Sequence, residues 1–202
     1  MELLEKIIEE ALALGWVDWT VTITALVYVV LAARENPWCW VWGIVSCGLW
    51  AYASFAFYSL YLDALLQLFY VGMGFVGLYH WRAGKGQAGA PILRWPLRRH
   101  LPWLAGGSLL ALAFGYFFDA YTAAAATYLD AFVTVFAMLA TWLMTRKILE
   151  NWLYWIVIDA ASVYLFASRG AWLLAVVMAI YTVIAVTAYL GWRKQSLHNY
   201  FK

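Results

Sequence analysis

The chain has 202 residues, of which 66% are hydrophobic and only 12% are charged, and its formal net charge at pH 7 is +2. This composition, with a mean hydropathy of +0.75, leaves too little polar surface for a water-soluble globule. Because helices satisfy their own backbone hydrogen bonds in lipid, the composition predicts an all-α polytopic membrane protein whose surroundings are the lipid bilayer. We expect no nucleic-acid partner.

Residues 1–15 are predicted to form an amphipathic helix at the membrane interface. Apolar residues recur at helical spacing opposite the acidic ones; the apolar set is Leu3, Leu4, Ile7, Ile8, Ala11 and Leu12, and the acidic set is Glu2, Glu5, Glu9 and Glu10. Seven further stretches approach the length of about 20 apolar residues that crosses a bilayer. They are 16–33, 38–57, 58–81, 100–118, 122–144, 152–168 and 170–192. The sequence therefore predicts seven transmembrane helices.

The basic residues predict the orientation of these helices. Of the 13 Lys and Arg residues, only Lys6 and Arg169 fall on one side of a seven-helix topology. The other side holds Arg34, Arg82, Lys85, Arg94, Arg98, Arg99, Arg146, Lys147, Arg193, Lys194 and Lys202. By the positive-inside rule we expect a multi-pass protein of the bacterial inner membrane, with its N-terminus in the periplasm and its C-terminus in the cytoplasm.

A weak repeat relates the two ends of the chain. The residues that recur have aromatic, basic or amide side chains. Tyr70, Trp81 and Arg82 correspond to Tyr181, Trp192 and Arg193 at identical spacing, and Asn36 with Trp38 corresponds to Asn151 with Trp152. Two three-helix units separated by one helix must have the same orientation, so the pattern predicts 3+1+3 parallel repeats, as in sugar facilitators of the SWEET type. The alternative is that these Tyr and Trp residues only anchor helix ends at the membrane interfaces.

This organisation divides the chain into five expected parts. They are an N-terminal amphipathic helix at 1–15, a first three-helix repeat at 16–81, a cytoplasmic loop with a linker helix at 82–121, a second three-helix repeat at 122–192, and a cytoplasmic tail at 193–202.

Ionisable groups within a membrane are costly, so they are candidates for a binding site. Asp63, Asp130 and Asp159 are predicted to lie at depth, with Asp159 near the middle of its helix. Asp63 and Gln67 are four residues apart and share one helix face, where they could hold a polyhydroxylated ligand. Asp130 could instead make only a structural hydrogen bond to a neighbouring helix.

The stretch 152–168 carries a second candidate group. Trp152, Trp155 and Asp159 follow a spacing of three and four residues, which places two indoles and one carboxylate on one stripe of a helix. Such a stripe suits a flat, cationic ring, through stacking and cation–π attraction. The alternative is that Trp152 belongs to an interfacial belt and that Trp155 packs internally.

The sequence lacks the residues for several kinds of chemistry. No Lys or Arg lies in the middle of a predicted span, so a phosphorylated substrate would meet no buried cation and a retinal would find no Schiff-base lysine. No Ser and His pair lies at membrane depth, and no Walker motif is present. Cys39 and Cys47 have no metal-ligand spacing and suggest no disulfide. We expect neither an enzyme nor a bound cofactor or metal.

Three segments carry a family resemblance: NPWCWVWGIV at Asn36 to Val45, YLDALLQLFYVGMGFVGLYHW at Tyr61 to Trp81, and TRKILENWLYWIVID at Thr145 to Asp159. They resemble the PnuC family of bacterial vitamin transporters. The resemblance implies a homotrimer that moves an unphosphorylated vitamin by facilitated diffusion, after which a cytoplasmic kinase traps the vitamin. The best-known members carry nicotinamide riboside.

The resemblance also implies roles for single residues. Trp152, Trp155 and Asp159 look like the signature of the family, and Asp63 and Gln67 look like contacts to ribose or other polar groups. Asn151 belongs to the same tract as a helix cap. Tyr70 and Asp130 complete the predicted substrate-binding set. Thr141 departs from the pattern, because Gln is expected there.

The sequence thus predicts a facilitator of nicotinamide riboside that works by alternating access between two repeats. Thiamine, another cationic ring compound, fits the same residues. A membrane sensor or receptor of such vitamins is the alternative from another class, and proton-coupled symport through Asp130 or Asp159 is a third possibility. An acidic, aromatic site and a cationic ligand agree in sign.

Overall fold

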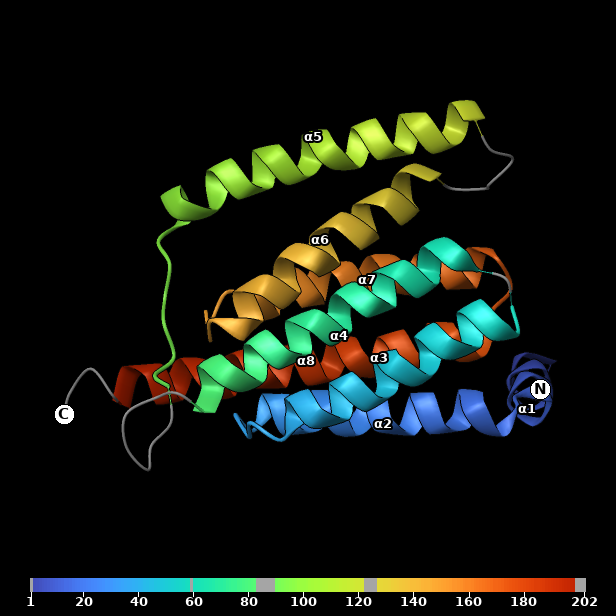
Figure 1. Ribbon diagram of the computed structural model, residues 1–202, viewed down its shortest axis with the longest axis horizontal. Coiled ribbons are helices and arrows are strands. Elements are labelled where there is room, and N and C mark those ends of the chain that lie inside the picture. Colours follow the sequence, from blue (N-terminus) through green and yellow to red (C-terminus); the bar gives the residue numbers. More distant parts are fainter. Residues whose placement is uncertain (1, 59, 83–89, 122–126, 199–202) are drawn as a thin grey trace.

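The computed structural model describes residues 2–58, 60–82, 90–121 and 127–198. Within them the chain forms eight α-helices and no named strand (Figure 1). The helices are α1 (Glu2–Ala13), α2 (Trp16–Ala33), α3 (Cys39–Ala56), α4 (Tyr61–Arg82), α5 (Leu97–Tyr121), α6 (Thr127–Thr145), α7 (Asn151–Ser168) and α8 (Trp172–His198). The all-helical prediction is confirmed, and α1 lies within the predicted N-terminal segment.

Five helices are long and apolar enough to cross a membrane within the described part of the chain: α2, α3, α5, α6 and α8. The two remaining long helices, α4 and α7, carry Asp63, Gln67 and Asp159, whose polarity lowers the hydropathy of a helix. The helix bounds also differ from those predicted. Residues 122–126 of the fifth predicted span lie outside the described residues, and α8 continues to His198, into the segment predicted as a tail.

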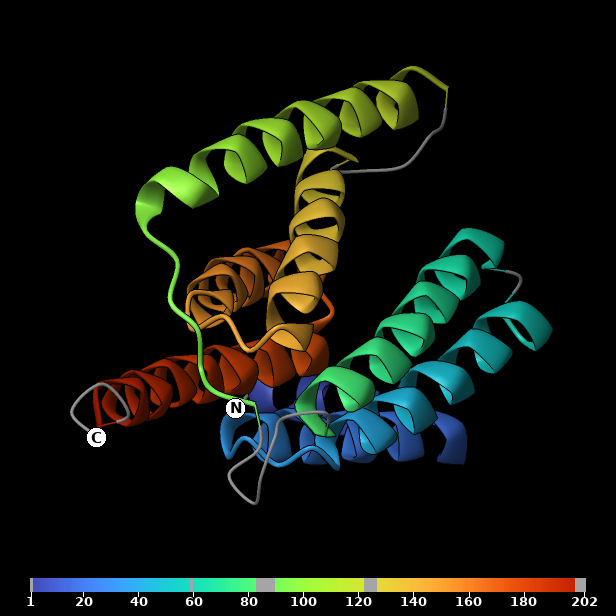
Figure 2. The ribbon, with the colours of Figure 1, turned by 60° about the vertical axis from the view of Figure 1, so that its left-hand side comes forward.

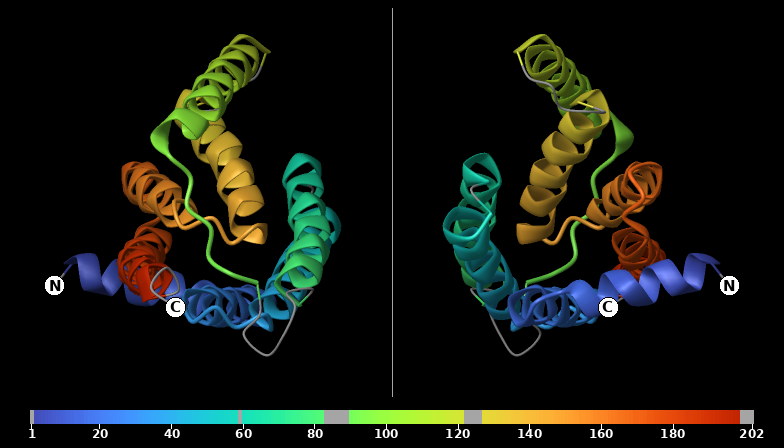
Figure 3. Two further views of the ribbon diagram at one scale, coloured as in Figure 1. Left: turned by 90° about the vertical axis from the view of Figure 1, so that its left-hand side faces the viewer. Right: turned by 90° about the vertical axis from the view of Figure 1, so that its right-hand side faces the viewer.

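The long helices form two three-helix units joined by α5. In the first unit α3 packs against α2 and α4, and in the second unit α7 packs against α6 and α8. The units meet where α4 packs against α6 and where α2 packs against α8 (Figures 2 and 3). The connecting helix α5 packs against α6. Each unit therefore contacts the other through its first and third helices.

One end of the bundle collects the basic residues. This basic end is made of the C-termini of α2, α4, α6 and α8 and the N-termini of α3, α5 and α7, on the left of Figure 1. Its described cations are Arg34, Arg82, Arg94, Arg98, Arg99, Arg146, Lys147, Arg193 and Lys194. The opposite end, where α1 lies, carries Lys6 and Arg169.

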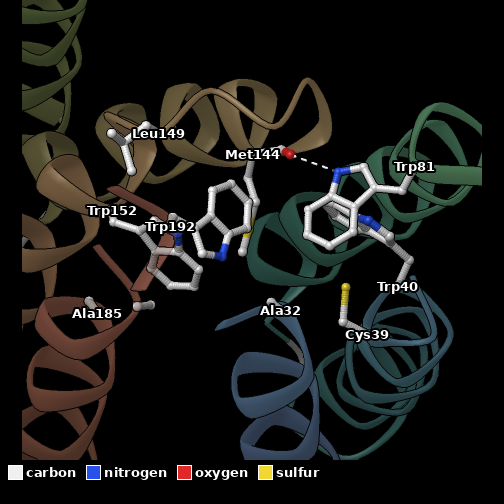
Figure 4. Close-up of a cluster of buried hydrophobic side chains, with 10 residues drawn as sticks. Ala32, Cys39, Trp40, Trp81, Met144, Leu149, Trp152, Ala185 and Trp192 are labelled. Carbon is white, nitrogen blue, oxygen red and sulfur yellow. Dashed lines mark hydrogen bonds between the residues drawn. The ribbon is translucent and has the colours of Figure 1, made fainter. Parts of the chain in front are cut away.

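A cluster of four tryptophans fills the core at the basic end (Figure 4). Trp40 packs edge-on against Trp81, with ring centroids 5.4 Å apart, and Trp152 packs edge-on against Trp192 at 5.5 Å. Trp81 and Trp192 also contact each other at 5.8 Å. Each ring contact of this kind stabilises by about 0.5–1.5 kcal/mol beyond the apolar area that it buries. The tryptophan cluster therefore joins the two units.

At the opposite end, α1 is attached to α8 through Glu10. The Glu10 carboxylate accepts hydrogen bonds from the backbone N–H groups of Trp172, at 3.1 Å, and Leu173, at 2.7 Å. These N–H groups belong to the first turn of α8, where backbone N–H groups have no hydrogen-bond partner within their own helix. A carboxylate at a helix N-terminus is also favoured by the helix dipole.

Replacing Glu10 by Ala should loosen the start of α8. We expect a loss of about 0.5–2 kcal/mol, as for other helix caps, seen as faster amide exchange in the first turn of α8. Glu9→Ala is the matched control, because Glu9 is exposed on the same helix. Equal exchange rates in the two variants would contradict this attachment.

Candidate functional site

Asp159 is a buried carboxylate at the middle of α7. Its residue is 5% exposed, and none of the described residues donates a hydrogen bond to it. Ser162, one turn further along the helix, donates instead to the Ile158 carbonyl. A buried charge without a partner is unfavourable in the empty protein. Such a group is suited to meet a cation or hydrogen-bond donors supplied by a ligand.

Trp155 and Trp152 lie on the same helix but in different surroundings. Trp155 is partly buried and packs against both the tryptophan cluster and a second apolar cluster, formed around Phe136 and Ile158. Trp152 is 1% exposed and enclosed against Trp192, and its indole N–H has no hydrogen-bond partner. Of the two predicted stacking residues, Trp155 is the one that borders both clusters.

Asn151 does not have the position predicted for it. The residue at the N-cap of α7 is Glu150, and Asn151 is the first helical residue. Its side-chain amide donates to the Ile148 carbonyl at 2.6 Å, while its Oδ1 atom is buried without a partner. The assignment as a helix cap was wrong by one residue, because the turn before α7 continues in a helical backbone conformation through Glu150.

Asp63 and Gln67 do share one face of α4, as predicted. The Asp63 carboxylate accepts hydrogen bonds from the Ser54 hydroxyl at 2.6 Å and from the Gln67 amide at 3.5 Å. The predicted depth of Asp63 was wrong, since α4 begins at Tyr61 and Asp63 lies in its first turn. This network therefore sits toward the end of the bundle opposite the basic end.

Asp130 also lies in the first turn of its helix, α6, and not at depth. Its carboxylate pairs with the Arg169 guanidinium, and its side chain is 41% exposed. The pair lies within the second unit and its adjoining turn. Asp130 thus has a structural partner on the chain itself.

Tyr70 belongs to a polar group between the two units that sequence reasoning did not assemble. We call Tyr28, Cys47, Tyr70 and Tyr181 the inner polar cluster, because the last three side chains lie within electrostatic range of Tyr28, and both Tyr70 and Tyr181 lie within range of Cys47. They come from α2, α3, α4 and α8. Asp63 lies within range of Cys47, and Asp159 within range of Tyr181, so the cluster links the two predicted carboxylates.

One sequence signal could have revealed part of this cluster. Tyr181 is the repeat counterpart of Tyr70, so the repeat itself points to it. The spacing of Cys47 indicates neither a disulfide nor a metal site and gives no signal of a polar cluster. The contribution of Tyr28 carries no sequence signature, because it depends on how helices far apart in the chain face one another.

The cavity between α5 and α6 lies apart from these residues. Its volume is about 590 Å³, and it is lined by Pro102, Trp103, Gly106, Gly107, Leu110, Val135, Leu139 and Trp142. These side chains are almost all apolar and suit hydrocarbon. The cavity therefore adds no polar group to the candidate site.

Comparison with known proteins shows similarity to one family of transporters. A model of the family described as nicotinamide mononucleotide transporter matches residues 15–194. The chain is 29% identical to the nicotinamide riboside transporter PnuC of Escherichia coli (strain K12), over 89% of this chain and 85% of that protein. It is 24% identical to the riboflavin/roseoflavin transporter RibM of Streptomyces davaonensis, over 88% of this chain and 84% of that protein.

A solved structure has a similar fold. The protein described as the vitamin B3 transporter PnuC superposes with a TM-score of 0.73 at 25% sequence identity, covering 97% of this chain and 90% of that one. The proteins named in these comparisons are transporters and not enzymes. Their similarity extends over both three-helix units and α5.

Proposed function

This chain belongs to the nicotinamide mononucleotide transporter family, in agreement with the resemblance found in the sequence, and we propose that it moves nicotinamide riboside across the bacterial inner membrane by facilitated diffusion. The observation that carries the proposal is the Asp159 carboxylate, which is buried, has no hydrogen-bond donor among the described residues, and lies one helical turn from Trp155 on α7. The pyridinium ring of the riboside is flat and positively charged. The ring would place a positive charge next to the Asp159 carboxylate.

The transport cycle requires two halves that move relative to one another, and we propose that these are 3+1+3 parallel repeats. The units α2 to α4 and α6 to α8 support this division, with α5 as the linker. The proposed parts are the five predicted ones, 1–15, 16–81, 82–121, 122–192 and 193–202. The vitamin would bind between the repeats, as in transporters whose site lies at a repeat interface.

The orientation of the protein in the membrane follows from the distribution of its basic residues. We propose that the basic end faces the cytoplasm, with the N-terminus outside and α1 at the outer membrane interface. Three copies would form the transporter, and a cytoplasmic kinase would trap the vitamin by phosphorylation. Facilitated diffusion alone only equilibrates the vitamin, so accumulation would depend on that kinase.

Residue roles follow from the positions described above. Trp155 would stack on the pyridinium, and Asp159 would balance its charge. Asp63 and Gln67 would bind hydroxyl or amide groups nearer the outer end, with Tyr70 between them and Asp159. The remaining predicted residues would act indirectly: Trp152 and Asn151 by supporting the start of α7, and Asp130 through its ion pair with Arg169.

The unphosphorylated riboside fits better than the mononucleotide that gives the family its name. Among the described Lys and Arg residues, Lys147 is the only buried one. Its ammonium group is already paired with Glu35 at 3.1 Å, at the basic end. A phosphate next to Asp63 or Asp159 would therefore meet like charge and no free cation among these residues.

Binding measurements on the purified protein test the choice of vitamin. We expect nicotinamide riboside to bind, and nicotinamide mononucleotide and riboflavin, which lack its net positive charge, to bind at least tenfold more weakly, which is a difference of about 1.4 kcal/mol. Tighter binding of thiamine or riboflavin would reassign the substrate. Uptake into proteoliposomes must stop at equilibrium. A protein that binds but moves nothing would be a sensor, and uptake driven by a proton gradient would be symport.

A further inference from the structure

Two turns at the basic end have the same backbone conformation. Glu35 follows α2 by two residues, and Lys147 follows α6 by two residues. Both have positive φ angles, 56° and 51°, which few residues other than glycine adopt. The turn after the first helix of one unit thus matches the turn after the first helix of the other.

These two matching residues are joined to each other. The Lys147 ammonium donates to the Glu35 carboxylate at 3.1 Å, and the two side chains are only 5% and 14% exposed. The ammonium also donates to the Ala90 carbonyl at 2.9 Å and stands 4.9 Å above the Trp81 ring. A buried ion pair needs such additional partners to offset the loss of water. This pair joins the two units across their interface.

A reciprocal pair of hydrogen bonds lies beside the ion pair. The Trp81 indole donates to the Met144 carbonyl of α6 at 3.0 Å, and the Trp192 indole donates to the Ala33 carbonyl of α2 at 3.1 Å. In both cases the third helix of one unit binds the last turn of the first helix of the other unit. The two donors, Trp81 and Trp192, are 111 residues apart along the chain, and the two acceptors, Ala33 and Met144, are also 111 residues apart. Carbonyls at helix C-termini lack partners within the helix, so both turns gain a donor from the opposite unit; the Met144 carbonyl also accepts the Lys147 backbone N–H at 3.0 Å.

At the opposite end, two polar contacts of the described residues each stay within one unit. The Tyr58 hydroxyl donates to Asp18 at 3.0 Å within the first unit, and Arg169 pairs with Asp130 within the second. The charged and indole contacts described above therefore close the basic end specifically. A vitamin bound between the units could leave through this end only after these contacts separate.

We propose that Glu35 and Lys147, with Trp81 and Trp192, form a latch that holds the basic end closed and breaks once in every transport cycle. The latch rests on the proposed function, because it assigns the step at which the vitamin is released to the cytoplasm. Its symmetry has a mechanical consequence. Because each unit supplies one charge and one indole, both units must move apart together for the latch to open.

A reversible crosslink tests whether the latch must open. The variant carries Glu35→Cys and Lys147→Cys and is joined by a short bifunctional thiosulfonate reagent. We expect crosslinking to abolish nicotinamide riboside uptake into proteoliposomes, a reductant to restore it, and riboside binding to persist in the crosslinked protein. Each single-cysteine variant, treated with the same reagent, controls for modification of the native Cys39 and Cys47. Full uptake by the crosslinked protein would show a static contact and overturn the latch.

A second measurement needs no vitamin, so it separates failure of the latch from failure of the proposed function. Cys39 is 0% exposed beneath the latch, in the tryptophan cluster, and its alkylation by N-ethylmaleimide reports opening. Lys147→Met should accelerate this reaction by at least tenfold, which a shift of about 1.4 kcal/mol in the opening equilibrium produces. Lys194→Met, an exposed lysine at the same end, is the matched control. Equal alkylation rates in the two variants would overturn the latch, whereas a working latch in a protein that binds no riboside would overturn the substrate instead.

Discussion

Asp159→Asn should remove nearly all nicotinamide riboside binding and uptake. The substitution keeps the size of the side chain, removes its charge and replaces one acceptor oxygen by a donating NH2 group. Loss of one charge from a buried pair costs about 2–5 kcal/mol, so the dissociation constant should rise by roughly 30-fold or more. Calorimetry on the purified protein and uptake into proteoliposomes measure the two effects.

Asp119→Asn provides the matched control for this experiment. Asp119 is an exposed carboxylate near the end of α5, outside both three-helix units, and it makes the same change of charge. We expect it to bind and transport like the unmodified protein. If Asp159→Asn bound the riboside as tightly as Asp119→Asn does, the site would lie elsewhere in the bundle.

Gly77→Ala should destabilise the whole bundle by about 1–3 kcal/mol, the usual cost of overpacking a filled core. A Cβ atom at Gly77 would lie 2.3 Å from the Trp40 ring, closer than van der Waals contact permits. The ring has little room to yield, because Trp40 is 2% exposed and packs against both Trp81 and Tyr28. Thermal unfolding in detergent measures the loss.

Gly72 offers the control on the same helix. A Cβ atom there would meet nothing within 4 Å, so Gly72→Ala should leave stability unchanged or raise it by up to about 1 kcal/mol, the preference of a helix interior for alanine. Similar unfolding temperatures for the two variants would mean that α3 and α4 do not approach each other as closely as described.

The candidate site was predictable only in part, and the difference has a physical cause. Spacing along a helix correctly placed Asp63 beside Gln67, because residues four apart always share a helix face. Depth was less predictable: helix α4 begins three residues later than the hydropathy suggested, which places Asp63 in a first turn. Trp152 could not be distinguished from Trp155 by spacing, since the enclosure of Trp152 comes from Trp192 on another helix.

The sequence by itself determined that the surroundings of this protein are a lipid bilayer, and it determined the order of the helices. Apolar length and the one-sided distribution of Lys and Arg are properties of single segments, and each segment meets the bilayer independently of its neighbours. Only the tertiary structure decided which helix faces meet. The pairing of Glu35 with Lys147 and the inner polar cluster arise from residues far apart in the chain, and periodicity reports the face of a helix but not what lies opposite that face.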